Sequence, residues 1–176
     1  MAAGNVHRGH VIGGRFLHRM RQLLGALRPS VREDERAAAY GWLSPAECAL
    51  FETMTVRDQE HGIIVCRRVA AAHGETDPDL LTAALLHDCG KGKVHLWHRI
   101  AHVALHAGAA GIGERMCDEH GSSWRRALWR LRYHPAIGAR MAVAAGSSPE
   151  VVRLIRDQDV RPADPRLAAL QAADDA

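Results

Sequence analysis

The architecture of this chain follows most directly from the stretch Ala84-Leu85-Leu86-His87-Asp88-Cys89-Gly90-Lys91, in which an apolar run ends in a histidine and an aspartate. The leucines and alanines from Leu80 onward predict a buried helix. An imidazole and a carboxylate at the polar end of a buried helix supply half of a divalent-metal site. Lys91, which closes the stretch, is within reach of a phosphate. The stretch therefore predicts metal-assisted hydrolysis of a phosphate ester.

Signals for the start and the end of helices recur along the chain. A capping side chain followed by proline opens helices at Ser44-Pro45, Asp77-Pro78, Ser148-Pro149 and Asp164-Pro165. Gly74 and Gly90 are expected to end two of these helices. No alternation of apolar and polar residues predicts a competing strand. We predict an all-α fold with helices over about 45–54, 55–74, 78–90, 94–106, 123–133, 135–145, 149–156 and 165–173.

The length and the composition of the chain are sufficient for one substantial hydrophobic core. A chain of 176 residues with 47% hydrophobic content is expected to form a single domain. We expect a mobile tail over 1–12, a helical extension over 13–54 and a metal-binding helical domain over 55–176. Arginines cluster at 15–36 and 125–132, and we interpret them as solvated helix faces. The formal charge of +3 therefore does not require nucleic acid as a partner.

The cysteines and the most apolar segment favour a cytoplasmic protein without a membrane span. Four cysteines show no CxxC spacing, and we expect no secretory segment before them: Cys48, Cys66, Cys89 and Cys117. The apolar segment 94–113 contains four histidines on one helical stripe: His95, His98, His102 and His106. Together with Arg99 they predict an ordinary helix. We interpret the stripe as its polar edge, with a second metal site as the alternative.

Four motifs in a fixed order strengthen the interpretation of the central stretch. They are His61, the His87-Asp88 pair with Lys91, His134-Pro135 and Ala173-Asp174. In this order they resemble the HD-domain superfamily of metal-dependent phosphohydrolases, over roughly two thirds of the chain. The resemblance implies an HD-type helical bundle over 55–176, preceded by the N-terminal helical extension. In that family an upstream histidine, the His-Asp pair and a distant downstream aspartate hold the metal.

Carried over residue by residue, the resemblance gives the metal ligands His61, His87, Asp88 and Asp174, with Asp175 as the competitor of Asp174. Adjacent helical residues point about 100° apart, so the His-Asp pair needs ligands from other helices. His61 begins an apolar stripe and Asp174 ends an apolar helix. The alternatives are a surface histidine beside Glu60 and ordinary acidic residues at a frayed terminus. The ligand set suits one ion of Mn, Fe, Co, Ni or Zn, and Mg less well.

Further side chains are candidates for the chemistry itself. Lys91 is the first candidate to bind the phosphate, and Arg57, one helical turn before the upstream histidine, is the second. Asp88 is expected both to bind the metal and to orient the attacking water. His134 resembles a family histidine that contacts substrate or helps to bind a second metal. Where two-metal members carry a further histidine, this chain has Arg156-Asp157-Gln158-Asp159, so we expect one metal and a substrate-contacting or supporting His134.

Two functions from different classes account for these features. The first is a metal-dependent phosphohydrolase, a phosphomonoesterase or phosphodiesterase, that cleaves a small phosphorylated compound with a metal-activated water. A nucleotide is the favoured substrate, since members of the family hydrolyse deoxynucleotides, cyclic nucleotides or alarmones. The alternative is a non-catalytic HD-type signalling or interaction module that binds a nucleotide or a partner protein. The intact set of candidate ligands favours the enzyme, and a monomer and a helix-packed dimer fit equally well.

Overall fold

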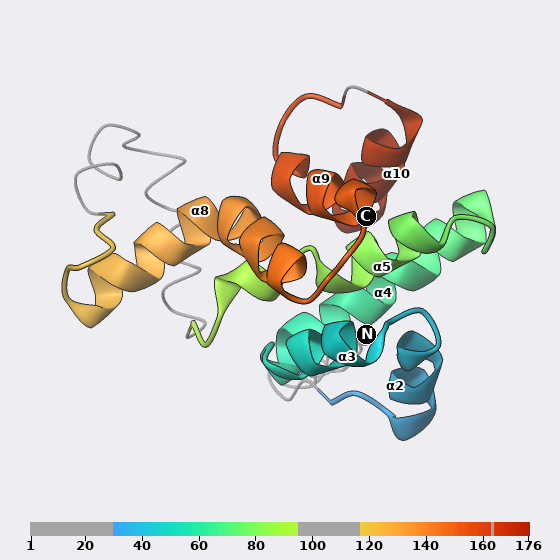
Figure 1. Ribbon diagram of the computed structural model, residues 1–176, viewed down its shortest axis with the longest axis horizontal. Helices are drawn as coiled ribbons and strands as arrows, with labels where there is room; N and C mark the ends of the chain where they lie inside the picture. The colour runs from blue at the N-terminus through green and yellow to red at the C-terminus, as the bar shows by residue number, and fades with distance from the viewer. Residues whose placement is uncertain (1–29, 95–116, 163) are drawn as a thin grey trace, which may run out of the picture. The chain divides into compact units, whose positions relative to one another are not determined.

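The computed structural model describes residues 30–94, 117–162 and 164–176 (Figure 1). Within these ranges every regular element is a helix, which confirms the predicted all-α class. They are α2 (Glu33–Tyr40), α3 (Pro45–Glu52), α4 (Val56–His73), α5 (Pro78–Leu86), η1 (Cys89–Lys91), α8 (Ser123–Ala144), α9 (Pro149–Asp157) and α10 (Pro165–Asp174). None of the helices in these three ranges has the length and apolarity needed to cross a membrane.

Several predictions fall on parts of the chain that the structure does not describe. The tail expected over 1–12 and the beginning of the N-terminal extension lie outside the described residues. So does the helix predicted over 94–106, apart from Val94 at its start. The histidine stripe also lies there: His95, His98, His102 and His106. These features stay predictions.

Side-chain caps start four helices at the predicted positions. The Ser44 hydroxyl accepts a hydrogen bond from the Glu47 backbone, and the Glu47 carboxylate accepts one from the Ser44 backbone, which completes a capping box at α3. The side chains of Asp77, Ser148 and Asp164 each accept from the backbone N–H three residues further on. Proline follows the cap in all four helices. Gly74, with φ of +79°, ends α4 as predicted.

Helix α5 is buried along most of its length, which explains its apolar sequence. Every side chain from Leu80 to Leu86 is buried, and the helix contacts α3, α4, α9 and α10. One core cluster runs through the helices and includes Phe51 of α3, Val65 of α4 and Leu170 of α10. Residues Val31–Ala176 form one unit that includes α2 and α3 from the N-terminal extension.

The end of α5 differs from the prediction. The helix stops before the His-Asp pair, and Gly90 lies in the short 3-10 helix η1 instead of ending α5. A Cβ atom on Gly90 would lie 2.1 Å from the backbone oxygen of His134 and 2.6 Å from the backbone nitrogen of Gly138. Gly90 is therefore required by the close packing of η1 against α8. The left-handed backbone conformation belongs to Gly92, with φ of +63°.

The two helices predicted over 123–133 and 135–145 are one helix, α8, which continues through Pro135. Proline has no N–H and leaves the carbonyl four residues earlier, that of Leu131, without its helical donor. The ring of His134 replaces this donor, because its Nδ1 lies 2.7 Å from the Leu131 oxygen. The prediction of a break was wrong because the neighbouring side chain satisfies the group that proline leaves unpaired.

Candidate metal centre

Four predicted ligands from three segments of the chain come together in the structure. His61 lies on α4, His87 and Asp88 follow α5, and Asp174 is the last residue of α10. His61 and Asp174 are 113 positions apart in the sequence, yet His61 Nε2 lies 2.7 Å from Asp174 Oδ1. Asp175 follows α10 and is exposed. The aspartate that meets the histidines is therefore Asp174.

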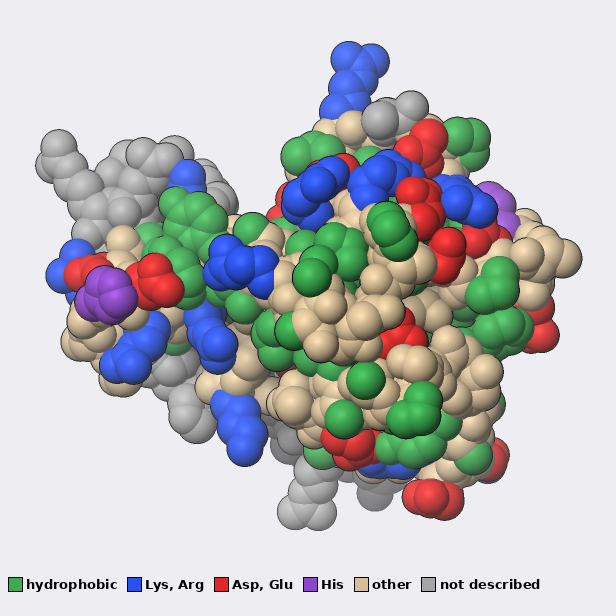
Figure 2. All heavy atoms as spheres, in the orientation of Figure 1, with side chains coloured by type: hydrophobic (Ala, Val, Ile, Leu, Met, Phe, Trp, Pro, Cys, Tyr) green, Lys and Arg blue, Asp and Glu red, His purple; other side chains and the backbone are tan. Residues whose placement is uncertain are grey.

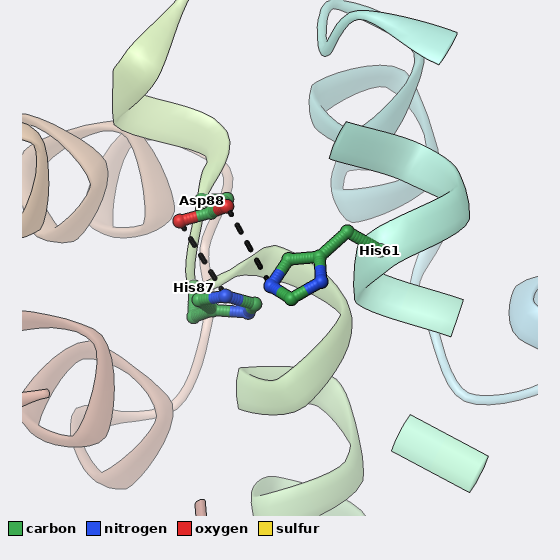
Figure 3. A group of neighbouring side chains, drawn as sticks. All are labelled: His61, His87 and Asp88. Atoms are coloured by element: carbon green, nitrogen blue, oxygen red, sulfur yellow. Dashed lines mark ion pairs between the residues drawn. The ribbon is translucent and has the colours of Figure 1, made fainter. Parts of the chain in front are cut away.

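The distances within this cluster suit a metal ion. One potential ligand atom from each of His61, His87 and Asp88 lies within 4.8 Å of the other two. Figure 3 shows His61 reaching from α4 toward the His87-Asp88 pair. Asp88 Oδ1 lies 3.4 Å from His87 Nε2, and Asp88 Oδ2 lies 4.0 Å from His61 Nε2. Asp174 Oδ1 lies 3.5 Å from His87 Nε2. Imidazole nitrogens and carboxylate oxygens in this arrangement can hold a divalent metal ion.

Backbone hydrogen bonds determine which ring nitrogens face Asp88. His87 Nδ1 lies 2.9 Å from the carbonyl oxygen of Ala84, and His134 Nδ1 bonds the Leu131 carbonyl. Because a carbonyl only accepts, each Nδ1 carries the hydrogen, and each neutral ring presents the lone pair of Nε2. Such a bond is the usual second contact of a metal-binding histidine.

Two acceptor atoms at the centre of the cluster have no hydrogen-bond partner in the described structure. These are His87 Nε2 and Asp88 Oδ1, and both are buried. A third acceptor, Nε2 of His134, lies 3.6 Å from the same Asp88 oxygen. Buried acceptors that face one another are stabilised by a cation between them. This arrangement fits a metal ion.

The surrounding charges keep both carboxylates ionised. Burial raises the pKa of Asp88, but the positive charges that His87, Lys91 and His134 carry in acid, where Asp88 titrates, outweigh burial and lower the pKa of Asp88 to about 2. The hydrogen bond from His61, together with the nearby His87 ring, lowers the pKa of Asp174. The cluster therefore offers two negative carboxylates at neutral pH.

The pKa values of His87 and His134 move in opposite directions. Burial lowers the pKa of His87, but the negative charges of Asp88 and Asp174 together outweigh burial and raise it. Burial, followed by the charge of Lys91, lowers the pKa of His134. The His134 ring is therefore neutral at pH 7, and its Nε2 can accept a proton.

Two of the predicted cationic side chains occupy different positions relative to the cluster. Lys91 lies in η1, and its Nζ is 2.6 Å from Asp88 Oδ2. An ammonium group has three hydrogens, so two remain for other acceptors. Arg57 lies in the first turn of α4, four residues before His61. Its role in binding phosphate stays a prediction.

Two glutamines that the sequence analysis did not assign to the site link its segments. Gln158 Nε2 is buried and donates to the carbonyl of His87 at 2.9 Å and to a carbonyl of α9 at 3.0 Å. Gln171 Nε2 donates to the carbonyls of Gln158 and Val160, at 2.8 and 2.6 Å. These hydrogen bonds connect the segment between α9 and α10 to His87. They also connect it to α10, the helix that carries Asp174. The sequence around these glutamines does not predict that their side chains donate to distant backbone carbonyls.

Comparison with known proteins finds no match for the chain among family models, curated proteins or solved structures. The function of the chain is therefore inferred from the residues of the cluster and from their geometry. Membership of the HD-domain superfamily stays a prediction from the four sequence motifs.

Proposed function

We propose that this protein is an HD-type, metal-dependent phosphohydrolase that cleaves a phosphate ester of a small molecule, with a nucleotide as the favoured substrate. The observation that carries the proposal is the pair of buried acceptors, His87 Nε2 and Asp88 Oδ1, 3.4 Å apart and without hydrogen-bond partners in the described structure. With His61 and Asp174 they would hold one ion of Mn, Fe, Co, Ni, Zn or Mg. When bound, such an ion lowers the pKa of water and polarises a phosphoryl oxygen.

The reaction converts a phosphate ester and water into an alcohol and the released phosphate group, which is inorganic phosphate for a monoester and a phosphate monoester for a diester. The water oxygen forms a bond to phosphorus, the bond from phosphorus to the ester oxygen breaks, and a proton of the water ends on the departing alcohol. His134 can accept the proton of the water, because its ring is neutral and its Nε2 faces Asp88 at 3.6 Å. Lys91, beside Asp88, is our first candidate to stabilise the phosphate charge, and Arg57 is the second.

The proposal includes a cytoplasmic location and a small-molecule partner. Cys48, Cys66 and Cys89 are free thiols, which supports a reducing compartment. The donor set of the cluster, two imidazoles and two carboxylates around a buried centre, would hold an ion that can polarise a phosphoryl oxygen of a small substrate, and it does not require nucleic acid.

Metal content tests the proposal directly. Elemental mass spectrometry is applied to the wild type, to Asp88→Ala and to the matched control Asp175→Ala, each purified without chelator. We expect about one equivalent of metal in the wild type and in the control, and little in Asp88→Ala. A screen for phosphate release from nucleotides then follows on the wild type.

Two results would count against the enzyme. If all three proteins stay empty after incubation with Mn or Fe, the metal site does not exist. If the wild type binds metal but hydrolyses no nucleotide or simple phosphate ester, as judged by release of the alcohol, phosphate or diphosphate, the chain is the non-catalytic module that binds a nucleotide or a partner protein.

A further inference from the structure

A basic surface lies beside the candidate metal centre. Helix α8 carries five arginines and no acidic residue over its whole length. Two lysines, Lys91 and Lys93, flank Gly92 in the segment that packs against this helix. Figure 2 shows lysine and arginine side chains gathered over the first half of α8 and the adjoining stretch. We define the basic patch as Lys91, Lys93, Arg126 and Arg130.

The spacing of α8 residues connects this patch to the metal centre. Arg126, Arg130 and His134 are four residues apart and lie on one face of the helix. This face of α8 reaches the metal centre at His134, because His134 Nε2 lies 3.6 Å from Asp88 Oδ1. The backbone of Arg130 lies about one helical turn before that of His134, or about 6 Å along the helix axis.

The guanidinium of Arg130 packs against Gly92. A Cβ atom on Gly92 would lie 2.3 Å from Arg130 Nη1, so the absence of a side chain leaves the space that the guanidinium fills. Gly92 directly follows Lys91, whose Nζ lies 2.6 Å from Asp88 Oδ2. The guanidinium therefore lies beside the residue whose ammonium reaches the centre.

Within the described part of the chain, the Arg130 guanidinium has no ion-pair partner and can donate hydrogen bonds to a ligand. No carboxylate of the described residues forms an ion pair with it, whereas Arg125 on the same helix lies 3.7 Å from Asp118. The side chain is half-buried, which restricts its geometry more than that of the exposed Arg126 and Arg140. A planar guanidinium held in place can donate two parallel hydrogen bonds to a phosphate.

We propose that Arg130 forms a second anion subsite, which binds a phosphate group other than the one that is hydrolysed. The substrate class is then an ester of a diphosphate, whose ester-linked phosphate occupies the metal centre. Water adds to that phosphorus, the bond from phosphorus to the ester oxygen breaks, and the products are the alcohol and a diphosphate. This inference depends on the proposed function, because the first phosphate has to occupy the metal centre. Arg130 acts on specificity, since the subsite distinguishes a diphosphate from a monophosphate.

Calorimetric titration with two inorganic anions tests the subsite without knowledge of the natural substrate. Orthophosphate and pyrophosphate are titrated into the manganese-loaded protein, each from a solution with equimolar Mn²⁺. The proteins are the wild type, Arg130→Gln, Arg130→Lys and the control Arg140→Gln, an exposed arginine of the same helix. We expect the wild type to bind pyrophosphate about tenfold more tightly than orthophosphate.

The variants separate the subsite from the metal centre. Arg130→Gln should remove the preference for pyrophosphate and leave orthophosphate affinity within about twofold, while Arg130→Lys retains part of the preference and Arg140→Gln all of it. If Arg130→Gln keeps the full preference while metal and orthophosphate bind, the subsite is wrong and the proposed function stands. If the wild type binds no manganese, the proposed function fails and the subsite fails with it.

Discussion

At the scale of single residues, Gly90 determines how closely η1 approaches α8. A methyl group there would meet the backbone oxygen of His134 at 2.1 Å and the backbone nitrogen of Gly138 at 2.6 Å. Backbone atoms inside a helix cannot move away as a flexible side chain can. We expect Gly90→Ala to lower the free energy of unfolding by about 3 kcal/mol. Urea denaturation measures this loss.

The control for this prediction is Gly74→Ala. Gly74 has φ of +79°, and no atom lies within 4 Å of a Cβ placed there. With ψ of 178°, its backbone lies in a region that glycine alone occupies readily, so the cost is backbone strain alone, about 1–3 kcal/mol. A loss below about 1 kcal/mol in Gly90→Ala would show that close packing at Gly90 is unimportant. Metal affinity should fall only in Gly90→Ala, because only that change moves the segment next to Asp88.

Cys66 gives a prediction that depends on pH. Burial raises the pKa of this thiol from 9.0 to about 11. At pH 8 the folded protein then holds about a hundredfold less thiolate than the unfolded chain. Iodoacetamide should alkylate Cys66 at least a hundredfold more slowly in the native protein than in urea, as measured by peptide mass spectrometry.

The same pKa shift affects stability in alkali. The unfolded thiol loses its proton first, so the stabilisation from neutral Cys66 is complete below pH 9 and declines as pH rises toward 11. The urea midpoint of the wild type should fall over this range, and Cys66→Ala should show a smaller fall. Rapid alkylation of the native thiol at pH 8 would contradict the burial of Cys66.

At the scale of elements, the helix starts could be predicted because their signals are local. Ser44 with Glu47 and Asp77 with Pro78 contain the capping side chain, its target or the first-turn proline within four residues. The continuity of α8 could not be predicted, because it depends on the His134 ring reaching the Leu131 carbonyl. The close packing of Gly90 against α8 could not be predicted either, because α8 lies far from Gly90 in the sequence.

The connection between α9 and α10 supports a prediction about Gln158. Its side chain is the donor to the His87 carbonyl, so Gln158→Ala leaves that buried group unpaired. We expect a loss of about 1–3 kcal/mol in stability and about a tenfold loss in metal affinity. Urea denaturation and manganese titration measure the two effects.

A second buried glutamine provides the matched control. Gln59 also donates to two backbone carbonyls, those of Phe51 and Met54, but these belong to α3 and the turn after it. Gln59→Ala should cost similar stability and leave metal affinity within about twofold. If both variants lose metal affinity equally, Gln158 contributes only to stability and does not position His87.

At the scale of the whole molecule, the cluster joins segments that the sequence keeps far apart. The His-Asp pair could be predicted from its place after an apolar run. No spacing rule connects His61 with Asp174, which are 113 positions apart, and only the resemblance to a family suggested both. The fold brings them together because α4 and α10 both pack against α5, the helix that leads into the pair.

Because its proposed ligands come from α4, the end of α5 and α10, a bound metal should stabilise the whole fold. An ion present at a hundred times its Kd adds about 2.7 kcal/mol to the free energy of unfolding. In a chain of this size that corresponds to a rise in Tm of about 5–10 °C. Differential scanning calorimetry with manganese, and again after chelator, measures this shift.

The contribution of α10 is isolated by comparing Asp174→Asn with Asp175→Asn, two adjacent changes of the same chemistry. Both side chains are exposed, but Asp174 Oδ1 lies 2.7 Å from His61 Nε2, whereas Asp175 is the residue after the end of the helix. The metal-dependent rise in Tm should therefore fall below about 2 °C in Asp174→Asn and remain complete in Asp175→Asn. The comparison uses the shift, since Asp174→Asn also loses its charged contact with His61 in the metal-free protein. A full shift in Asp174→Asn would mean that the metal is held by His61, His87 and Asp88 alone and that α10 closes the fold without binding it.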